Sequence, residues 1–270
     1  MITSLIAAPL VLAGIFLLPP LGFSLFIGAI IVLAAWEWGN LAGLAQVPRC
    51  IFAALVALVL FAISLASVFY PSMPHLLLAA HLLMAAALVW WLAALYLVAT
   101  FPTSSHYWSS PPITLLAGLL TLTAGWTSLV LIRQSDNYTY LICLLFFLIW
   151  GADIGAYFVG KAFGKAKLAP NVSPGKSWAG LCGGLATALV IAAAMSLWLG
   201  RPSLGSMDGL LFLSFCAMVT LASVLGDLTI SMFKRQRNIK DASNLLPGHG
   251  GLLDRIDSLL AATPLFAAGL

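Results

Sequence analysis

The stretch Tyr140–Gly160, YLICLLFFLIWGADIGAYFVG, decides the fold class because it is almost entirely apolar and carries a single charged residue, Asp153. A helix of about 20 apolar residues crosses a hydrocarbon core about 30 Å thick. Eight further apolar runs occur along the chain, at Ile2–Leu18, Leu21–Trp38, Ile51–Phe69, Leu76–Ala99, Ile113–Ile132, Ser177–Leu199, Gly209–Phe233 and Gly251–Ala268. We therefore predict an all-α, polytopic integral membrane protein with about nine transmembrane helices.

The composition excludes several other classes of protein. The 270-residue chain is 62% hydrophobic and 7% charged, with a mean hydropathy of +1.08, whereas soluble domains are about half apolar. A net charge of +4, without a basic helix interleaved with aromatic residues, argues against nucleic-acid binding. The four cysteines lie in or beside apolar segments without CxxC spacing, so we expect buried small hydrophobic side chains rather than disulfides or a metal site. The first segment lacks the basic region of a cleaved signal and is expected to stay in the membrane.

The basic residues predict the orientation, since cytoplasmic loops carry an excess of lysine and arginine. With nine spans, nine basic residues share one side with the N-terminus: Arg49, Lys161, Lys165, Lys167, Lys176, Lys234, Arg235, Arg237 and Lys240. The opposite side has only Arg133 and Arg201. We expect the first side to be cytoplasmic, the C-terminus to lie outside, and the protein to be a multi-pass protein of the inner (cytoplasmic) membrane.

Four side chains share one helical face where the Tyr140–Gly160 run ends, at steps of three and four: Trp150, Asp153, Tyr157 and Lys161. An aspartate deep in an apolar helix costs about 2.5–3.5 kcal/mol on insertion scales, so it should face a partner, a metal or a wet cavity. A structural pair between Asp153 and a lysine near the helix end is an equal alternative.

The segment Ser173–Gly180, SPGKSWAG, contains Gly-Lys-Ser but is not a P-loop, because Pro170 occupies the position of the motif's first glycine. A helix N-terminus that carries Ser and Lys binds anions through its backbone N–H groups and partial positive charge. A helix N-cap next to a cytoplasmic lysine explains the same residues, so both interpretations stay open.

The stretch Ser231–Asp257, SMFKRQRNIKDASNLLPGHGGLLDRID, holds five of the twelve basic residues and three of the eight acidic ones. Asp227, Ser231, Lys234 and Arg235 follow helical spacing at the end of one segment, and Asp254, Asp257 and Ser258 share a face at the start of the next. The three aspartates at 227, 254 and 257 converge if these two helices pack antiparallel.

Carboxylates beside lysine and arginine suit a complex of Mg²⁺ with a polyphosphate, because hard oxygens hold the metal and cations neutralise phosphate. A solvated basic loop would explain the bases, but neither the acids nor the Gly-His-Gly-Gly sequence around His249. For His249, contact with phosphate, action as a base and a loop-shaping hydrogen bond are all compatible with the sequence.

The run S-x-x-K-R-x4-K-D-x-S-x2-L-P-x-H-G-G-x2-D-R-x-D resembles the signature of the phosphatidate cytidylyltransferases, also called CDP-diacylglycerol synthases. Three further elements are similar to that family: Ser173-Pro174-x-Lys176-x-Trp178, Trp150-x-x-Asp153-x-x-x-Tyr157 and Trp36-Glu37-Trp38. The chain departs from the family at Gly175, where Lys is frequent, and at Ala179, where Glu or Gln is frequent.

The resemblance implies that the protein transfers the cytidylyl group of CTP to phosphatidate, giving CDP-diacylglycerol and pyrophosphate. A phosphatidate oxygen would attack the α-phosphorus of CTP, with Mg²⁺ as cofactor; a second cation is left open. We expect one membrane domain over residues 1–270, with N-terminal helices in 1–132 and catalytic helices and cytoplasmic loops in 133–270. The expected partners are CTP, phosphatidic acid and membrane lipids, and a homodimer is left open.

On this basis our hypothesis assigns roles to individual residues. Asp227 and Asp254 are the expected metal ligands, with Asp257 as a third ligand or an orienting group. The rest of the expected catalytic set is Lys240, Asp241 and His249. The expected substrate-binding residues are Asp153, Ser173, Lys176, Ser231, Lys234, Arg235 and Arg255.

Two other functions remain as alternatives. A transporter or channel could use Asp153, Asp227 and Asp254 as a carboxylate relay, although this leaves the basic loop unexplained. An enzyme that acts on another lipid phosphate is the nearer alternative. CDP-alcohol phosphotransferases are disfavoured, because their DG-x2-AR…G-x3-D-x3-D spacing is missing.

Overall fold

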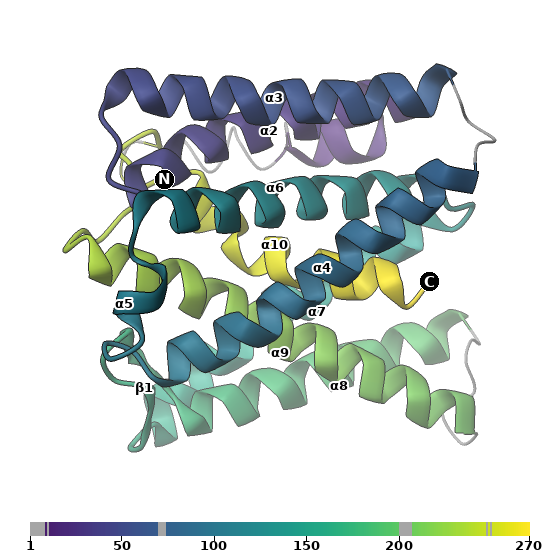
Figure 1. The fold of residues 1–270 in the computed structure, drawn as a ribbon. Coiled ribbons are helices and arrows are strands. Elements are labelled where there is room, and N and C mark those ends of the chain that lie inside the picture. The colour runs from purple at the N-terminus through teal and green to yellow at the C-terminus, as the bar shows by residue number, and fades with distance from the viewer. Residues whose placement is uncertain (1–8, 10, 70–73, 200–206, 247, 249) are drawn as a thin grey trace.

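A computed structural model describes residues 9, 11–69, 74–199, 207–246, 248 and 250–270. The elements are α2 (Pro20–Leu41), α3 (Gln46–Phe69), α4 (Pro74–Ala99), α5 (Ser105–Trp108), α6 (Pro111–Gln134), α7 (Tyr138–Phe163), β1 (Lys167–Ala169), β2 (Ser173–Ser177), α8 (Trp178–Leu199), α9 (Met207–Gln236) and α10 (Leu253–Ala268). The long helices lie alongside one another and run between two ends of the molecule (Figure 1). The all-α fold class is confirmed.

Seven helices in the described ranges are long and apolar enough to cross a membrane: α2, α3, α4, α6, α7, α8 and α9. Their outer faces expose large apolar side chains, such as Leu58, Leu92 and Val190, which are 63%, 70% and 68% exposed. Extended apolar surface of this kind needs lipid or protein to cover it. The chain is therefore a multi-pass membrane protein.

The predicted total of nine spans is not confirmed. About half of the first run, Ile2–Leu18, falls outside the described residues; within the described part, residues 11–16 are helical. The last run forms α10, which has only 16 residues and contains Pro264. At 1.5 Å per residue α10 is about 24 Å long, which is shorter than a hydrocarbon core of about 30 Å.

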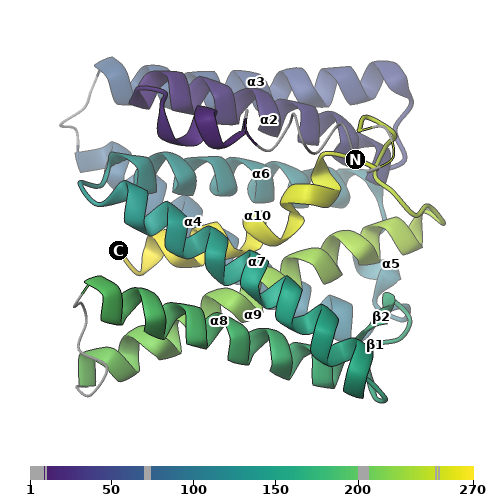
Figure 2. The same ribbon diagram turned by 180° about the vertical axis from the view of Figure 1, so that it is seen from behind.

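Helix α10 forms part of the protein core. It packs against α9 and α6 and also contacts α2, α4 and α7, and it lies among the other helices when the molecule is seen from behind (Figure 2). Leu260, Ala262 and Phe266 are almost completely buried. An apolar helix surrounded by other helices needs no lipid-facing surface, which explains why its length does not have to match the bilayer.

The connections that carry the predicted cytoplasmic residues gather at one end of the bundle (Figure 1). Hydrogen bonds join them: Asn171 Nδ2 donates to the Phe101 carbonyl at 3.2 Å, and Arg235 Nε donates to the Val172 carbonyl at 3.1 Å. Arg237 also donates to the end of α2. The described segments that follow α2, α7 and α9 thus lie at the same end, as the sequence predicts. That the basic end faces the cytoplasm stays a prediction.

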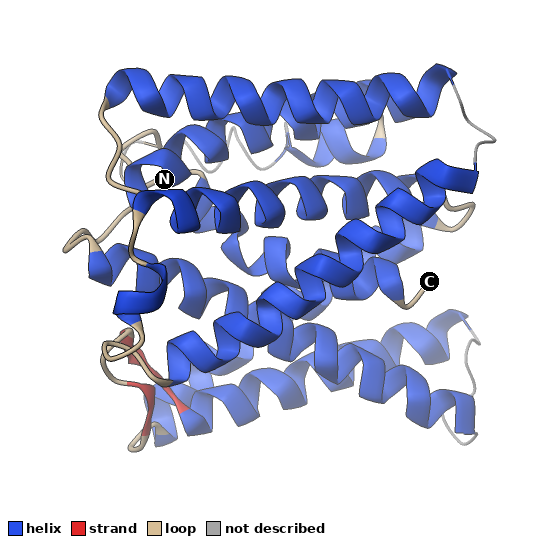
Figure 3. Ribbon diagram, viewed as in Figure 1, coloured by secondary structure: helices blue, strands red, loops and turns tan. Residues whose placement is uncertain are grey.

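A short hairpin and a short helix lie between the long helices at this end. β1 and β2 form an antiparallel hairpin, which appears as the red pair in Figure 3. Its last residue, Ser177, accepts the Gly180 N–H through Oγ at 3.1 Å and so caps α8. The Phe101–Pro112 segment contains α5, because Trp108 is buried with its ring 4.8 Å from Phe233.

The four cysteines are free, as expected. The expectation that all are buried is wrong for Cys50 and Cys182, which lie on exposed faces of α3 and α8. Outward-facing positions of a membrane bundle remain apolar, so the hydropathy of a run does not show which of its residues face the interior.

Candidate active site

One cavity at the basic end is lined by five of the chain's eight acidic residues: Asp153 from α7, Asp227 from α9, Asp241 from the following loop, and Asp254 and Asp257 from α10. The last two helices, α9 and α10, pack against each other and run in opposite directions (Figure 1), which is the condition on which convergence of the three aspartates depended. Gly226 permits their close approach, since a Cβ at this position would lie 2.4 Å from the Asp257 carbonyl oxygen. The predicted convergence of the aspartates at 227, 254 and 257 on one cavity follows from this packing.

Two lysines form ion pairs with two of these carboxylates. Lys176 Nζ lies 2.8 Å from Asp227 Oδ2, and Lys234 Nζ lies 2.6 Å from Asp254 Oδ1. The side chains of the second pair are 12% and 8% exposed, against 25% and 33% in the first. Because solvent screens a buried pair less, the Lys234–Asp254 attraction is the stronger of the two.

Asp254 also organises the loop that precedes it. Its Oδ2 accepts the Ala242 N–H at 2.8 Å and the Gly251 N–H at 3.0 Å. Gly248 and Gly250 adopt φ values of 76° and 79°, a region that glycine enters without steric strain. Glycine at these two positions therefore lets the backbone turn without strain before α10 begins.

Glu37 is a site residue that the sequence did not assign. It is completely buried and accepts hydrogen bonds from Ser243 Oγ at 2.5 Å, Leu252 N at 2.9 Å and Leu253 N at 2.5 Å. The available signal was its position as the only charged residue of the Leu21–Trp38 run. A charge in such a run requires an explanation, and its partners lie more than 200 residues away.

The cavity has a volume of about 790 Å³ and two different surfaces. The aspartates line one part together with Lys234 and Arg255. The remaining wall is apolar and is made by residues from 11–16, α2, α6, α7 and α10, including Ile27, Ile30 and Ile142. Such a cavity can hold a molecule with one highly charged part and one hydrocarbon part.

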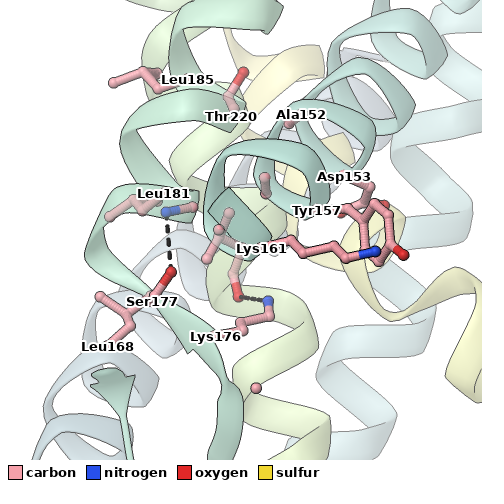
Figure 4. Close-up of a pocket in the computed structure, with 16 residues that line it drawn as sticks. Ala152, Asp153, Tyr157, Lys161, Leu168, Lys176, Ser177, Leu181, Leu185 and Thr220 are labelled. Atoms are coloured by element: carbon pink, nitrogen blue, oxygen red, sulfur yellow. Dashed lines mark hydrogen bonds between the residues drawn. The ribbon is translucent and has the colours of Figure 1, made fainter. Parts of the chain in front are cut away.

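A second cavity of about 350 Å³ lies between α7, α8 and the hairpin (Figure 4). Asp153 lines both cavities, and Lys176 lines the smaller one. Asp153 lies within the electrostatic influence of Lys176 and Asp227. Asp153 is therefore shared by the two cavities and lies near a charged residue of each, Lys176 and Asp227.

The predicted face of α7 is also present. Asp153, Tyr157 and Lys161 project from the same side of the helix in Figure 4. Lys161 Nζ lies 5.9 Å from the Tyr157 ring centre, and no ion pair between Lys161 and Asp153 occurs among the described residues. The alternative in which Asp153 serves a structural pair with a lysine at the end of its own helix is not supported.

The structure does not bring every predicted site residue to a cavity wall. Four of the described candidates line neither cavity: Ser173, Ser231, Arg235 and Lys240. Ser231 Oγ donates to Asp227 Oδ1 at 3.2 Å, and Arg235 is bound to the hairpin backbone. Both therefore support neighbours of the cavity. His249 lies outside the described residues, and the roles given to all these residues stay predictions.

The acidic side chains of the cavity can contribute to a metal site only together with other ligands. No three His, Cys, Asp or Glu side chains within the described ranges are grouped so that they could hold a metal by themselves. Mg²⁺, however, is commonly bound by one or two carboxylates plus substrate phosphates rather than by an all-protein cage. Asp227 and Asp254 on one cavity fit that second arrangement.

Comparisons with known proteins show the family to which the chain belongs. The sequence model of the cytidylyltransferase family matches residues 1–270. The chain is 52% identical to a phosphatidate cytidylyltransferase of Pseudomonas aeruginosa over 268 residues, covering 99% of this chain and 94% of that protein. It is 41% identical to a protein of the same name from Haemophilus influenzae over 279 residues, covering 97% and 94%. A Bacillus subtilis phosphatidate cytidylyltransferase is 40% identical over 156 residues, covering 54% and 55%. The chain belongs to the cytidylyltransferase family.

Proposed function

We propose that this protein transfers the cytidylyl group of CTP to phosphatidate, giving CDP-diacylglycerol and pyrophosphate. The observation that carries the proposal is the 790 Å³ cavity, which joins a group of aspartates and a lysine to an apolar wall within a membrane bundle. A lipid phosphate needs such a site, because its acyl chains and its phosphate require opposite surroundings. The names of the full-length relatives support the same reaction.

The reaction needs no nucleophile from the protein. A phosphatidate oxygen attacks the α-phosphorus of CTP, the bond from that phosphorus to the bridging oxygen breaks, and pyrophosphate leaves with the bond's electron pair. Catalysis then consists of alignment and neutralisation of charge. Lys176 and Lys234 line the cavities and are each paired with a carboxylate, so they are suited to hold phosphate oxygens.

The two ion pairs suggest how the site accepts its charged substrates. In the described structure each lysine neutralises a carboxylate, so the pairs carry no net charge. A complex of a divalent cation with a triphosphate offers both signs of charge at once. Lys176 and Lys234 can then turn to phosphate oxygens while Asp227 and Asp254 face the cation, so that no buried charge is left unpaired.

Mg²⁺ is the proposed cofactor, held by Asp227 and Asp254 and with Asp257 nearby. When bound, the ion would neutralise negative charge on the phosphates as the bond to pyrophosphate breaks. The proposed location is the inner membrane, with the basic end in the cytoplasm where CTP is available, as the excess of lysine and arginine favours. Self-association as a homodimer stays a prediction.

Purified protein in lipid vesicles or detergent, given labelled CTP, tests the proposal. We expect pyrophosphate release and a labelled lipid product that require both phosphatidate and Mg²⁺, and that EDTA abolishes and added Mg²⁺ restores. Turnover with another lipid phosphate but not with phosphatidate would reassign the substrate. Absence of any lipid-dependent pyrophosphate release would overturn the proposed function.

A further inference from the structure

Glu37 is a buried acid that the proposed reaction does not use. It is fully buried and lines neither cavity. Among the described residues its three hydrogen-bond partners are all donors, and they come from one short segment between Ser243 and Leu253. A carboxylate can accept all three bonds because it offers two oxygens with about four acceptor sites.

These bonds hold the start of α10. Leu252 occupies the N-cap position and provides no side-chain cap for the first turn. The Glu37 carboxylate, from α2, accepts the backbone N–H groups of Leu252 and Leu253 in its place. A negative charge at this position also interacts favourably with the helix dipole. Asp254, one residue further on, lies in the turn that Glu37 fixes.

The same segment is held from its other side by Asp254. The Asp254 carboxylate accepts the N–H groups of Ala242 and Gly251, so the loop backbone lies between two carboxylates. Gly251 occupies the narrowest point, where a Cβ would lie 2.9 Å from Glu37 Oε1 and 3.1 Å from Asp254 Oδ2. Little room is left for the loop or the first turn of α10 to shift independently.

The end of α2 that carries Glu37 is itself fixed to three neighbours. Trp38 Nε1 donates to the Thr114 carbonyl of α6 at 2.8 Å. The guanidinium of Arg49 on α3 lies 3.8 Å from the Trp36 ring centre, and its Nε donates to the Trp36 carbonyl. Asn40 donates to the Ala242 carbonyl at 2.8 Å. Through its hydrogen bonds Glu37 therefore fixes the loop to a part of the bundle that several contacts hold in place.

We propose that Glu37 is a positioning residue for the reaction: by accepting bonds from Ser243 and the first N–H groups of α10, it sets where Asp254 and Asp257 lie relative to Lys234 and Asp227. This inference rests on the proposed function. It extends the site to a residue of the N-terminal helices that touches no substrate. It also gives α2 a role in catalysis besides lining the apolar wall.

The informative variant is Glu37→Gln, which keeps the shape of the side chain. Its amide has one oxygen and one NH₂ group, so the NH₂ group must face at least one of the three donors. Loss of an outer partner of this kind typically lowers metal affinity or activity about 10- to 100-fold. We expect kcat to fall and half-saturating Mg²⁺ to rise by that order, while the KM for phosphatidate stays unchanged because Glu37 does not line the lipid-facing wall.

Three companion variants complete the test. Ser243→Ala removes one of the three bonds and should lower kcat less than Glu37→Gln does, in the same direction. Glu37→Asp keeps the charge on a shorter side chain and should retain more activity than Glu37→Gln. Asp136→Asn makes the matched change at an exposed acid between α6 and α7, at the opposite end of the bundle, and should behave like wild type.

Hydrogen exchange on the full-length protein supplies a readout that does not depend on turnover. The amides of Leu252 and Leu253 should exchange at least tenfold faster in Glu37→Gln than in wild type. In Asp136→Asn their exchange rates should equal those of wild type. The inference would be overturned if these two amides exchanged as slowly in Glu37→Gln as in wild type. It would also be overturned if kcat and the Mg²⁺ dependence of Glu37→Gln were like those of wild type. A parallel rise in the KM for phosphatidate would also overturn it. A wild-type protein without lipid-dependent turnover would instead count against the proposed function, and the exchange measurement would still decide the contact.

Discussion

The replacement Asp254→Asn separates the structural and the chemical contributions of one carboxylate. In the structure Asp254 Oδ2 accepts the Ala242 and Gly251 N–H groups, while Oδ1 faces Lys234 Nζ at 2.6 Å. An asparagine can keep both backbone bonds through its carbonyl oxygen. Its NH₂ group then faces the ammonium, so the ion pair is lost and the loop remains anchored.

The magnitude follows from the exposure of the pair. Breaking a fully buried ion pair costs about 3–5 kcal/mol, while an exposed pair contributes about 0–1 kcal/mol. With the Lys234 and Asp254 side chains 12% and 8% exposed, we expect Asp254→Asn to lower the free energy of unfolding by about 2 kcal/mol. Folded proteins have about 5–15 kcal/mol of stability, so the variant should remain folded.

Turnover should fall much more than stability. Removal of one group that stabilises developing charge lowers kcat about 10²- to 10³-fold, and the same change removes a proposed ligand of Mg²⁺. The assay is conversion of labelled CTP at increasing Mg²⁺ concentration, with the thermal unfolding midpoint measured on the same preparation. Turnover close to wild type at saturating Mg²⁺ would refute the assignment of Asp254, because neither the metal contact nor the lysine pair would then matter.

Three further predictions concern the surroundings of this group. Lys176→Gln should raise the KM for CTP about tenfold, as expected for loss of one charge-assisted contact. The control is Lys167→Gln, at an exposed position in the same hairpin, which should leave this KM unchanged. Equal KM values in the two variants would count against a phosphate contact. Gly251→Ala should lower the free energy of unfolding by about 1–3 kcal/mol, because the new Cβ would lie 2.9 and 3.1 Å from two carboxylate oxygens. Gly175→Ala should destabilise the protein less, since its Cβ would have no atom within 4 Å. Thermal unfolding midpoints in the opposite order would contradict this. Ile30→Trp places a larger side chain on the apolar wall of the cavity. Steady-state kinetics should show a higher KM for long-chain phosphatidate, a smaller rise for a short-chain analogue and an unchanged KM for CTP. An effect on the KM for CTP alone would be inconsistent with a lipid-binding wall.

The sequence by itself determined that this is a helical membrane protein. An apolar segment in hydrocarbon must satisfy its backbone groups within itself, so each run becomes a helix whatever its neighbours are. The helical spacing from Asp227 to Arg235 and from Asp254 to Ser258 was predictable for the same local reason. Arg235 shows the limit of this reasoning, because its guanidinium is bound to the hairpin backbone rather than lining a cavity.

Only the tertiary structure decided which groups meet. Lys176 and Asp227 are 51 residues apart in the sequence and form an ion pair, and Glu37 reaches Leu253 across 216 residues. Hydropathy also gave α10 the appearance of a span, although its surroundings make it an interior helix. The physical reason is the same in each case. Local spacing fixes the face of a helix on which a side chain lies, but the neighbour of that face depends on how helices distant in sequence pack, which at Gly226 depends on the absence of a single Cβ.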